Sequence, residues 1–187
     1  ERARAVARSL LGPEMWSGWG IRTLAADQPA YNPLSYHDGT VWPHDNALCA
    51  YGLGAYGMTA EACGVLTGLW HAAQHFRRLR LPELFCGLGS DGRAFPVHYP
   101  VACSPQAWSS AAWFLFLRAA LGISADAPAR TLRIAFPQLP PWLDEVVLEG
   151  LRVGPARATL RFVRGPKGAF PELVDVTGGP LRVRIEI

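Results

Sequence analysis

The spacing of apolar residues changes partway along this chain of 187 residues, and the change limits the folds it can adopt. In the segment 59–80, apolar side chains recur every three or four residues, which places them on one face of an α-helix. In the final segment 181–187, LRVRIEI, they stand at every second position, as in a β-strand with one apolar face. The sequence therefore predicts a helical part followed by a β part.

Two further helices are predicted before residue 59. The opening residues 1–11 carry an apolar face and stop near Gly12, a residue that commonly ends helices. A second helix is expected to begin at a cap formed by Asp45 or Asn46.

The segment 104–122 predicts the last helix, with Ser104 as its cap and Pro105 in the first helical position. Its residues are apolar nearly all round, which predicts burial on most sides. Beyond it, short alternating segments broken by Pro and Gly predict antiparallel strands. These strands are expected at 131–136, 145–153, 158–163 and 181–187.

Taken together, these signals describe a mainly α fold with a small antiparallel β appendage. The boundary is expected near residue 125, which gives a helical unit of residues 1–125 and a β module of residues 126–187. Helices and strands do not alternate, and no GxxxxGK[ST] phosphate loop occurs, so a Rossmann fold and a P-loop are excluded. Periodicity does not separate a helical toroid from an ordinary helical bundle.

The composition excludes two classes of partner. Hydrophobic residues make up 50% and charged residues 18% of the chain, as in a folded domain. The net charge of +3 is small, and the basic run at 77–80 has the pattern of a solvated helix end, so no nucleic-acid partner is expected. No apolar stretch approaches the length of a membrane span, so no membrane partner is expected either.

The four cysteines are widely spaced and form no CxxC pair, so neither a metal site nor a cofactor is expected. Reduced thiols fit a cytoplasmic protein. The chain begins within a helical pattern, and we expect it to be part of a longer protein.

The loop 15–46 concentrates aromatic and ionisable side chains between Pro and Gly residues. Long loops inside compact domains are usually functional. A sugar ring offers an apolar face of C–H groups and a rim of hydroxyls, so its site needs flat aromatic platforms beside hydrogen-bonding side chains. Any one of these residues could instead pack beneath the loop, but the cluster as a whole favours a sugar site. Its candidate members are Trp16, Trp19, Arg22, Tyr36, His37, Asp38, Trp42, His44 and Asp45.

A second loop, 81–104, carries a carboxylate among apolar residues. Glu83 is flanked by Leu81, Leu84 and Phe85. Because desolvation of a carboxylate is costly, such a group must be paired, hydrated or functional. An ion pair with a nearby arginine and a catalytic role both remain open for Glu83.

Three stretches together resemble a known family: SGWGIRTLAADQPAYNPLSYHDGTVWPHDNALCAYGLGAYG at 17–57, LPELFCG at 81–87 and YPVACSPQAWSSAAWFLF at 99–116. They closely resemble the C-terminal half of the bacterial amylo-α-1,6-glucosidases, the glycogen debranching-like members of the (α/α)6-toroid glycoside hydrolases. The resemblance covers nearly all of residues 1–123. It implies the second half of an (α/α)6 toroid, followed by the small β appendage.

The resemblance also implies an inverting hydrolase of α-glucosidic linkages that works with two carboxyl groups. Glu83 matches the general base of the family. By this resemblance the GWGIR motif at 18–22 and the segment YHDGTVWPHD at 36–45 line the sugar pocket. They implicate, as substrate-binding residues, Trp19, Arg22, His37, Trp42, His44 and Asp45. Gln106 and Trp108 of SPQAW are expected to face the same site.

The general acid of the family lies upstream of Glu1, whereas Asp38 and Asp45 are interpreted as binding or capping residues. An upstream half of the toroid is therefore an expected partner, together with an oligosaccharide or polysaccharide substrate. Two other functions stay open. One is a non-catalytic helical module that binds glycan or protein, and the other is a toroid phosphorylase, in which a phosphate site would replace the base.

Overall fold

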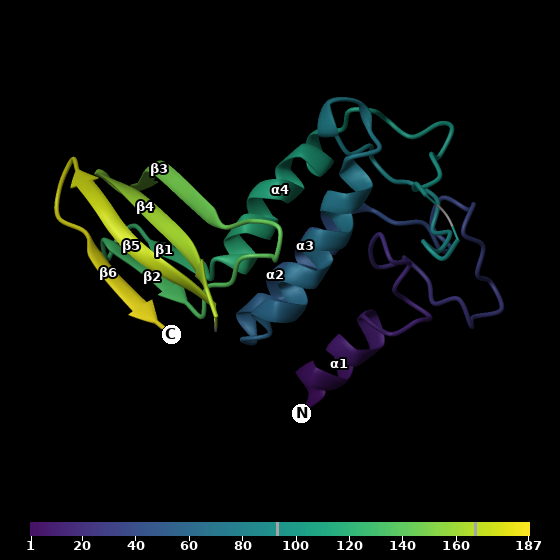
Figure 1. The fold of residues 1–187 in the computed structure, drawn as a ribbon, viewed down its shortest axis with the longest axis horizontal. Helices are drawn as coiled ribbons and strands as arrows, with labels where there is room; N and C mark the ends of the chain where they lie inside the picture. The colour runs from purple at the N-terminus through teal and green to yellow at the C-terminus, as the bar shows by residue number, and fades with distance from the viewer. Residues whose placement is uncertain (93, 167) are drawn as a thin grey trace.

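The computed structural model describes the chain apart from residues 93 and 167 (Figure 1). Its strands lie at one end of the molecule, the two long loops lie at the other, and the helices lie between them, with α4 leading into the β part. The helices are α1 (Arg2–Leu10), α2 (Pro43–Ala55), α3 (Thr59–Ala73), the short 3₁₀-helix η1 (Arg77–Leu79) and α4 (Ala107–Ala120). The strands are β1 (Ile123–Asp126), β2 (Thr131–Ala135), β3 (Glu145–Val153), β4 (Ala156–Gly165), β5 (Gly168–Thr177) and β6 (Arg182–Glu186).

The prediction of a mainly α fold, the second half of a helical toroid, is wrong. Helix accounts for 29% of the chain and strand for 26%, in two small sheets. The described residues of the long segments 11–42 and 80–106 contain no helix. Two strands, β1 and β5, were not predicted. β5 was missed because Pro171 interrupts its pattern, and an edge strand can hold a proline.

The two helices that flank the loops begin at other residues than the sequence predicted. Trp42 is the cap residue of α2 and Pro43 its first helical residue, so Asp45 lies inside the first turn. A carboxylate there complements the helix dipole. α4 begins at Ala107, and the side chain of Gln106, not Ser104, caps it by accepting from the Trp108 N–H at 3.1 Å.

The helical core consists of residues from α2, α3 and α4, together with Ala7 of α1 and buried residues of the two loops such as Val41 and Phe85. In α3 the helical spacing seen in the sequence is confirmed, since Val65, Leu66 and Leu69 are all buried. The prediction that α4 is buried on most sides is wrong, because Phe114 is 77% exposed and Trp108 59% exposed.

A short ladder of isolated backbone bridges joins the two long loops. Val41 pairs with Arg22 on one side and with Phe85 on the other, and Phe85 pairs in turn with His98. Val41 N–H donates to Phe85 O at 2.9 Å, and Phe85 N–H donates back to Val41 O at 3.1 Å. The loops approach so closely at Gly87 that a Cβ there would lie 1.6 Å from the carbonyl oxygen of Gly39.

The β part has a core of its own, separate from the helical core. One sheet has the strand order β1-β2-β6 and the other β3-β4-β5. The second sheet is antiparallel as predicted, but β2 and β6 pair in parallel, which the sequence did not indicate.

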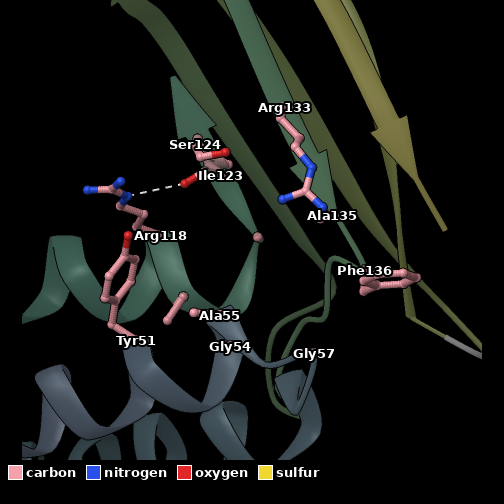
Figure 2. Close-up of a pocket in the computed structure, with 12 residues that line it drawn as sticks. Tyr51, Gly54, Ala55, Gly57, Arg118, Ile123, Ser124, Arg133, Ala135 and Phe136 are labelled. Atoms are coloured by element: carbon pink, nitrogen blue, oxygen red, sulfur yellow. Dashed lines mark hydrogen bonds between the residues drawn. The ribbon is translucent and has the colours of Figure 1, made fainter. Parts of the chain in front are cut away.

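A cavity of about 200 Å³ lies where the helices meet the first sheet (Figure 2). Arg118 of α4 donates from Nε to Ile123 O at 3.2 Å, and its guanidinium lies 4.9 Å from the ring centroid of Tyr51. Gly122 makes the turn from α4 into β1 with φ of 61°, and a Cβ there would lie 1.9 Å from Ala135 O. The connection between the two parts is therefore short and specific.

Asn46 holds the first loop against α2. It is 1% exposed, and its amide accepts from Ile21 N–H at 2.7 Å and donates to the carbonyl oxygens of Ile21 and Trp42 at 3.0 and 2.9 Å. Asn46→Ala leaves buried backbone groups without partners, so we expect it to lower the free energy of unfolding by about 2–4 kcal/mol in urea melts.

Asn32 is the matched control for this substitution. It is exposed, and its side chain accepts only from the N–H of Leu34 among its recorded bonds, at 3.0 Å. Asn32→Ala should change the free energy of unfolding by less than about 1 kcal/mol. Equal losses in the two variants would show that Asn46 does not organise the loop.

Candidate functional site

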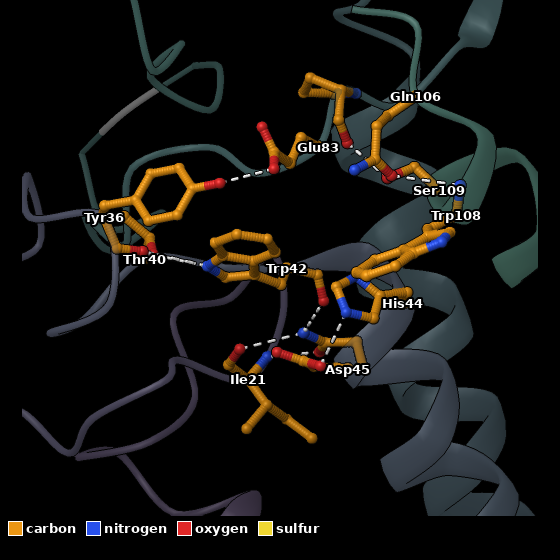
Figure 3. A network of polar contacts seen from close by, with 12 residues as sticks. Ile21, Tyr36, Thr40, Trp42, His44, Asp45, Glu83, Gln106, Trp108 and Ser109 are labelled. Carbon is orange, nitrogen blue, oxygen red and sulfur yellow. Dashed lines mark hydrogen bonds and ion pairs between the residues drawn. The ribbon is translucent and has the colours of Figure 1, made fainter. Parts of the chain in front are cut away.

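Residues close to the loop ladder, such as Trp42 and Glu83, line a pocket of about 400 Å³. Figure 3 shows its side chains converging from the first loop, the start of α2, the Glu83 segment and the start of α4. Its lining residues are Thr23, Tyr36, His37, Trp42, His44, Asp45, Glu83 and Trp108. The structure thus brings together seven of the twelve candidate residues named from the sequence.

Glu83 is held from three directions by neutral groups. Its own N–H donates to Cys103 O at 2.8 Å, and the N–H of Cys103 donates to Oε2 at 3.3 Å. The phenol of Tyr36 donates to Oε1 at 2.6 Å. Among the described residues, no arginine or lysine forms an ion pair with Glu83.

The segment that carries Glu83 is fastened to α4. The hydroxyl of Ser109, which is fully buried, donates to Pro82 O at 2.6 Å. Glu83 follows that anchored residue, and Phe85 two residues later is fixed by the loop ladder. The carboxylate therefore projects from a backbone that is held at both ends.

The carboxylate of Glu83 changes the pKa of the Tyr36 phenol. The hydrogen bond to Glu83 raises the pKa of the Tyr36 phenol to about 12, helped by partial desolvation and by the negative charge of the carboxylate. The ring makes edge contacts with His37 at 4.7 Å and Trp42 at 4.9 Å between centroids. Tyr36 therefore stays protonated at any pH near neutrality and donates to Glu83.

Trp42 forms the inner wall of the pocket. It is only 7% exposed, and its indole N–H lies within reach of Thr40 Oγ1 at 3.0 Å and of Tyr36 O at 3.2 Å. The ring of His37 stacks parallel to it, with centroids 5.7 Å apart and planes 7° from parallel. Trp42 is thus a fixed wall, and the exposed His37 presents more of its surface to a ligand.

The other side of the pocket is made by the starts of α2 and α4. His44 Nε2 lies 3.1 Å from Asp45 Oδ1, and the His44 ring meets Trp108 edge-on at 4.8 Å. His44 Nδ1 is buried and has no hydrogen-bond partner among the described residues. Trp108 is the largest exposed ring of the pocket.

Five candidates do not line the pocket, and three of them, Trp19, Arg22 and Gln106, have other roles in the fold. Trp19 is 8% exposed and packs in the helical core, edge-on to His75. Arg22 is equally buried, and its Nε donates to Gly87 O at 2.7 Å while Nη1 reaches carbonyl oxygens of residues 13, 14 and 16. Gln106 caps α4. Trp19 and Arg22 are therefore buried beneath the loop, where they pack against the core and hold the backbone.

Sequence reasoning missed Thr23 as a lining residue and Ser109 as an anchor. Thr23 directly follows the GWGIR motif, so the motif could have indicated it. Nothing in the sequence marks Ser109, because its role depends on a carbonyl group 27 positions away. Asp38 and Trp16 lie outside this pocket, and Ser35 Oγ donates to Asp38 Oδ2 at 2.8 Å.

All four cysteines are free, and burial raises the pKa of Cys63 to about 12. Within the part of the chain that the structure describes, no three His, Cys, Asp or Glu side chains are grouped to hold a metal ion. No described helix has both the length and the apolar character that crossing a membrane requires.

A pocket in which a carboxylate stands among aromatic rings is typical of proteins that act on carbohydrates. Residues 1–88 match a family model described as mannosylglycerate hydrolase MGH1-like glycoside hydrolase domain. This range contains Glu83 and the loop residues of the pocket but not Trp108. No curated protein matches the chain. The family match supports a glycoside hydrolase and a carbohydrate substrate.

The raised pKa of Tyr36 predicts a pH dependence of stability. The phenol titrates near 10 in the unfolded chain and near 12 in the folded protein, so the Tyr36–Glu83 bond stabilises the fold fully below pH 10. This contribution should disappear as the pH rises from 10 through 12.

The measurement is the difference in unfolding free energy between the wild type and Tyr36→Phe, taken from urea melts across that range. We expect a constant difference up to pH 10 and a shrinking one above it. A difference that persists unchanged at pH 12 would mean that the hydrogen bond is not formed in solution.

Proposed function

We propose that the pocket hydrolyses α-glucosidic linkages by an inverting mechanism in which Glu83 is the general base. In this mechanism a water molecule attacks the anomeric carbon and gives a proton to the carboxylate of Glu83. The oxygen of the leaving group takes a proton from a second carboxyl. The observation that carries the proposal is a carboxylate that lies at the pocket wall and accepts, among the described residues, from neutral donors.

The second carboxyl is proposed to come from outside residues 1–187. Inverting enzymes hold their two carboxyl groups roughly 6.5–9.5 Å apart to leave room for the water. Asp45 is the other carboxylate of the lining, but it lies beside His44 Nε2 and in the first turn of α2. It therefore suits substrate hydroxyls better than proton donation.

The proposal also includes a division into two domains, a class of substrate and a cellular compartment. Residues 1–125 carry the site and residues 126–187 form a separate module. The two hydrophobic cores support a division of this kind, with Leu121 and β1 on the side of the β part. The substrate is an oligosaccharide or polysaccharide of the type cleaved by debranching enzymes. Free thiols fit a reducing compartment such as the cytoplasm.

The description of the matched family favours a second candidate, the hydrolysis of mannosylglycerate. Among the described lining residues, however, the only side chains that could carry a positive charge are His37 and His44. A glycerate carboxylate would gain more from an arginine fork. A panel of maltose, isomaltose and mannosylglycerate separates the candidates, and a non-catalytic glycan-binding module would bind members of the panel without turnover.

Glu83→Gln in the full-length protein tests the assignment of the base. The amide keeps the size of the side chain but does not accept the proton from the attacking water, so kcat should fall by roughly 10²–10⁴-fold with little change in substrate affinity. The measurements are steady-state kinetics on the best substrate of the panel, together with the melting temperature.

Glu149→Gln is the matched control, because Glu149 is an exposed carboxylate on β3, outside the lining of the pocket. It should leave kcat unchanged. Near wild-type kcat in Glu83→Gln, combined with a large loss of melting temperature, would give Glu83 a structural role instead.

Trp108→Ala tests sugar binding at the rim. Since the ring is 59% exposed, its loss should leave the fold intact and weaken substrate binding by about 1–3 kcal/mol, as expected for an aromatic platform. Calorimetry on the Glu83→Gln background measures the binding alone.

Phe114→Ala provides the comparison, because Phe114 is exposed on the same helix and lies outside the lining of the pocket. It should leave the affinity unaltered. Equal affinities of the two variants would remove Trp108 from the site.

A further inference from the structure

We infer that Tyr36 is a positioning residue for Glu83, holding Oε1 so that Oε2 is the oxygen that takes the proton from the attacking water. This inference rests on the proposed hydrolytic function. The sequence predicted Tyr36 as an aromatic platform for sugar, and the structure shows its hydroxyl engaged with the carboxylate instead (Figure 3).

The two oxygens of Glu83 are held unequally. Tyr36 Oη lies 2.6 Å from Oε1, in the range of strong charge-assisted O–H···O⁻ bonds. The Cys103 N–H lies 3.3 Å from Oε2, a longer and weaker bond. The more weakly held oxygen keeps more of its electron density for a new proton, which assigns that proton to Oε2.

Tyr36 can orient Glu83 because Tyr36 itself is fixed. Its carbonyl oxygen accepts from Thr40 Oγ1 at 2.8 Å and lies 3.2 Å from the indole nitrogen of Trp42. Its ring is enclosed by edge contacts with His37, Trp42 and Tyr99. A donor held on all these sides loses little further entropy when it forms the bond to the carboxylate.

The proton balance of the step leaves Tyr36 unchanged. The water oxygen bonds to the anomeric carbon while the glycosidic bond breaks, and the water proton passes to Oε2. The leaving oxygen is protonated by the second carboxyl. Tyr36 keeps its proton throughout, which agrees with a phenol whose pKa is raised to about 12.

A double-mutant cycle tests the inference, with α-glucosyl fluoride and the best natural substrate, in the full-length protein. Tyr36→Phe keeps the ring and removes only the donor. It should lower kcat by about 10- to 100-fold, the span expected for a lost hydrogen bond to a charged group, while KM stays within about threefold. In the Glu83→Gln background the same substitution should have almost no effect, because Tyr36 acts through the carboxylate.

Tyr56→Phe is the matched control, because Tyr56 is 75% exposed at the end of α2, outside the lining of the pocket. It should leave kcat and KM unchanged. An unaltered kcat in Tyr36→Phe, or an equal loss in both backgrounds, would overturn the inference.

A titration that needs no activity completes the test. With ¹³C-labelled tyrosine, the resonance missing from Tyr36→Phe identifies Tyr36, and its pKa should fall from about 12 towards 10 in Glu83→Gln. An unchanged pKa would overturn the pairing. If the wild type hydrolyses no glycoside, the proposed function fails, and this titration still decides whether Tyr36 holds Glu83.

Discussion

The reciprocal backbone pairing of Val41 with Phe85 determines where the pocket forms. It joins two loops that lie more than forty positions apart in the sequence, and both residues are fully buried. Trp42 directly follows the first partner, and Glu83 stands two residues before the second. Without this pairing the aromatic wall and the carboxylate would belong to separate loops. A two-bond bridge succeeds here because Gly87 lets the loops approach and because the side chains of Val41 and Phe85 belong to the helical core.

Long loops carry many backbone polar groups, and this chain satisfies them with buried side chains. Arg22 reaches four carbonyl oxygens, and Asn46 serves both the N–H and the carbonyl oxygen of Ile21. Buried polar groups of this kind stabilise only when they are fully bonded, which restricts the loop to one conformation. The buried Arg22 and Asn46, which hold the loop, are therefore distinct from the side chains that line the pocket, although they lie close to them in the sequence.

The difference between buried residues that hold the loop and residues that line the pocket explains which features the sequence could predict. Local signals identified α3, the β3 strand and the composition of the pocket, because helical spacing, alternation and aromatic clustering are properties of neighbouring residues. The mainly α fold was wrong, because the loops stay irregular over long stretches and β5 tolerates Pro171 at the sheet edge. Trp19 and Arg22 were predicted to bind substrate, yet they are buried. A sequence motif indicates that a residue matters, but it does not show which way the side chain points. That direction depends on distant contacts, such as the hydrogen bond from Arg22 to Gly87, which lies 65 positions further along the chain.

Among the described residues, the hydrogen-bond donors to Glu83 are neutral, which suits its proposed role as general base. A cation beside a carboxylate favours the ionised form strongly and makes the group a poorer proton acceptor, whereas burial without partners would favour the protonated form. A phenol and a backbone N–H fix the orientation of the Glu83 carboxylate without placing a full positive charge beside it. The nearest strong cation of the motif, Arg22, is bonded to carbonyl oxygens and lies outside the lining of the pocket. The same loop packing that orders the backbone thus keeps the guanidinium away from the carboxylate that the proposed reaction needs.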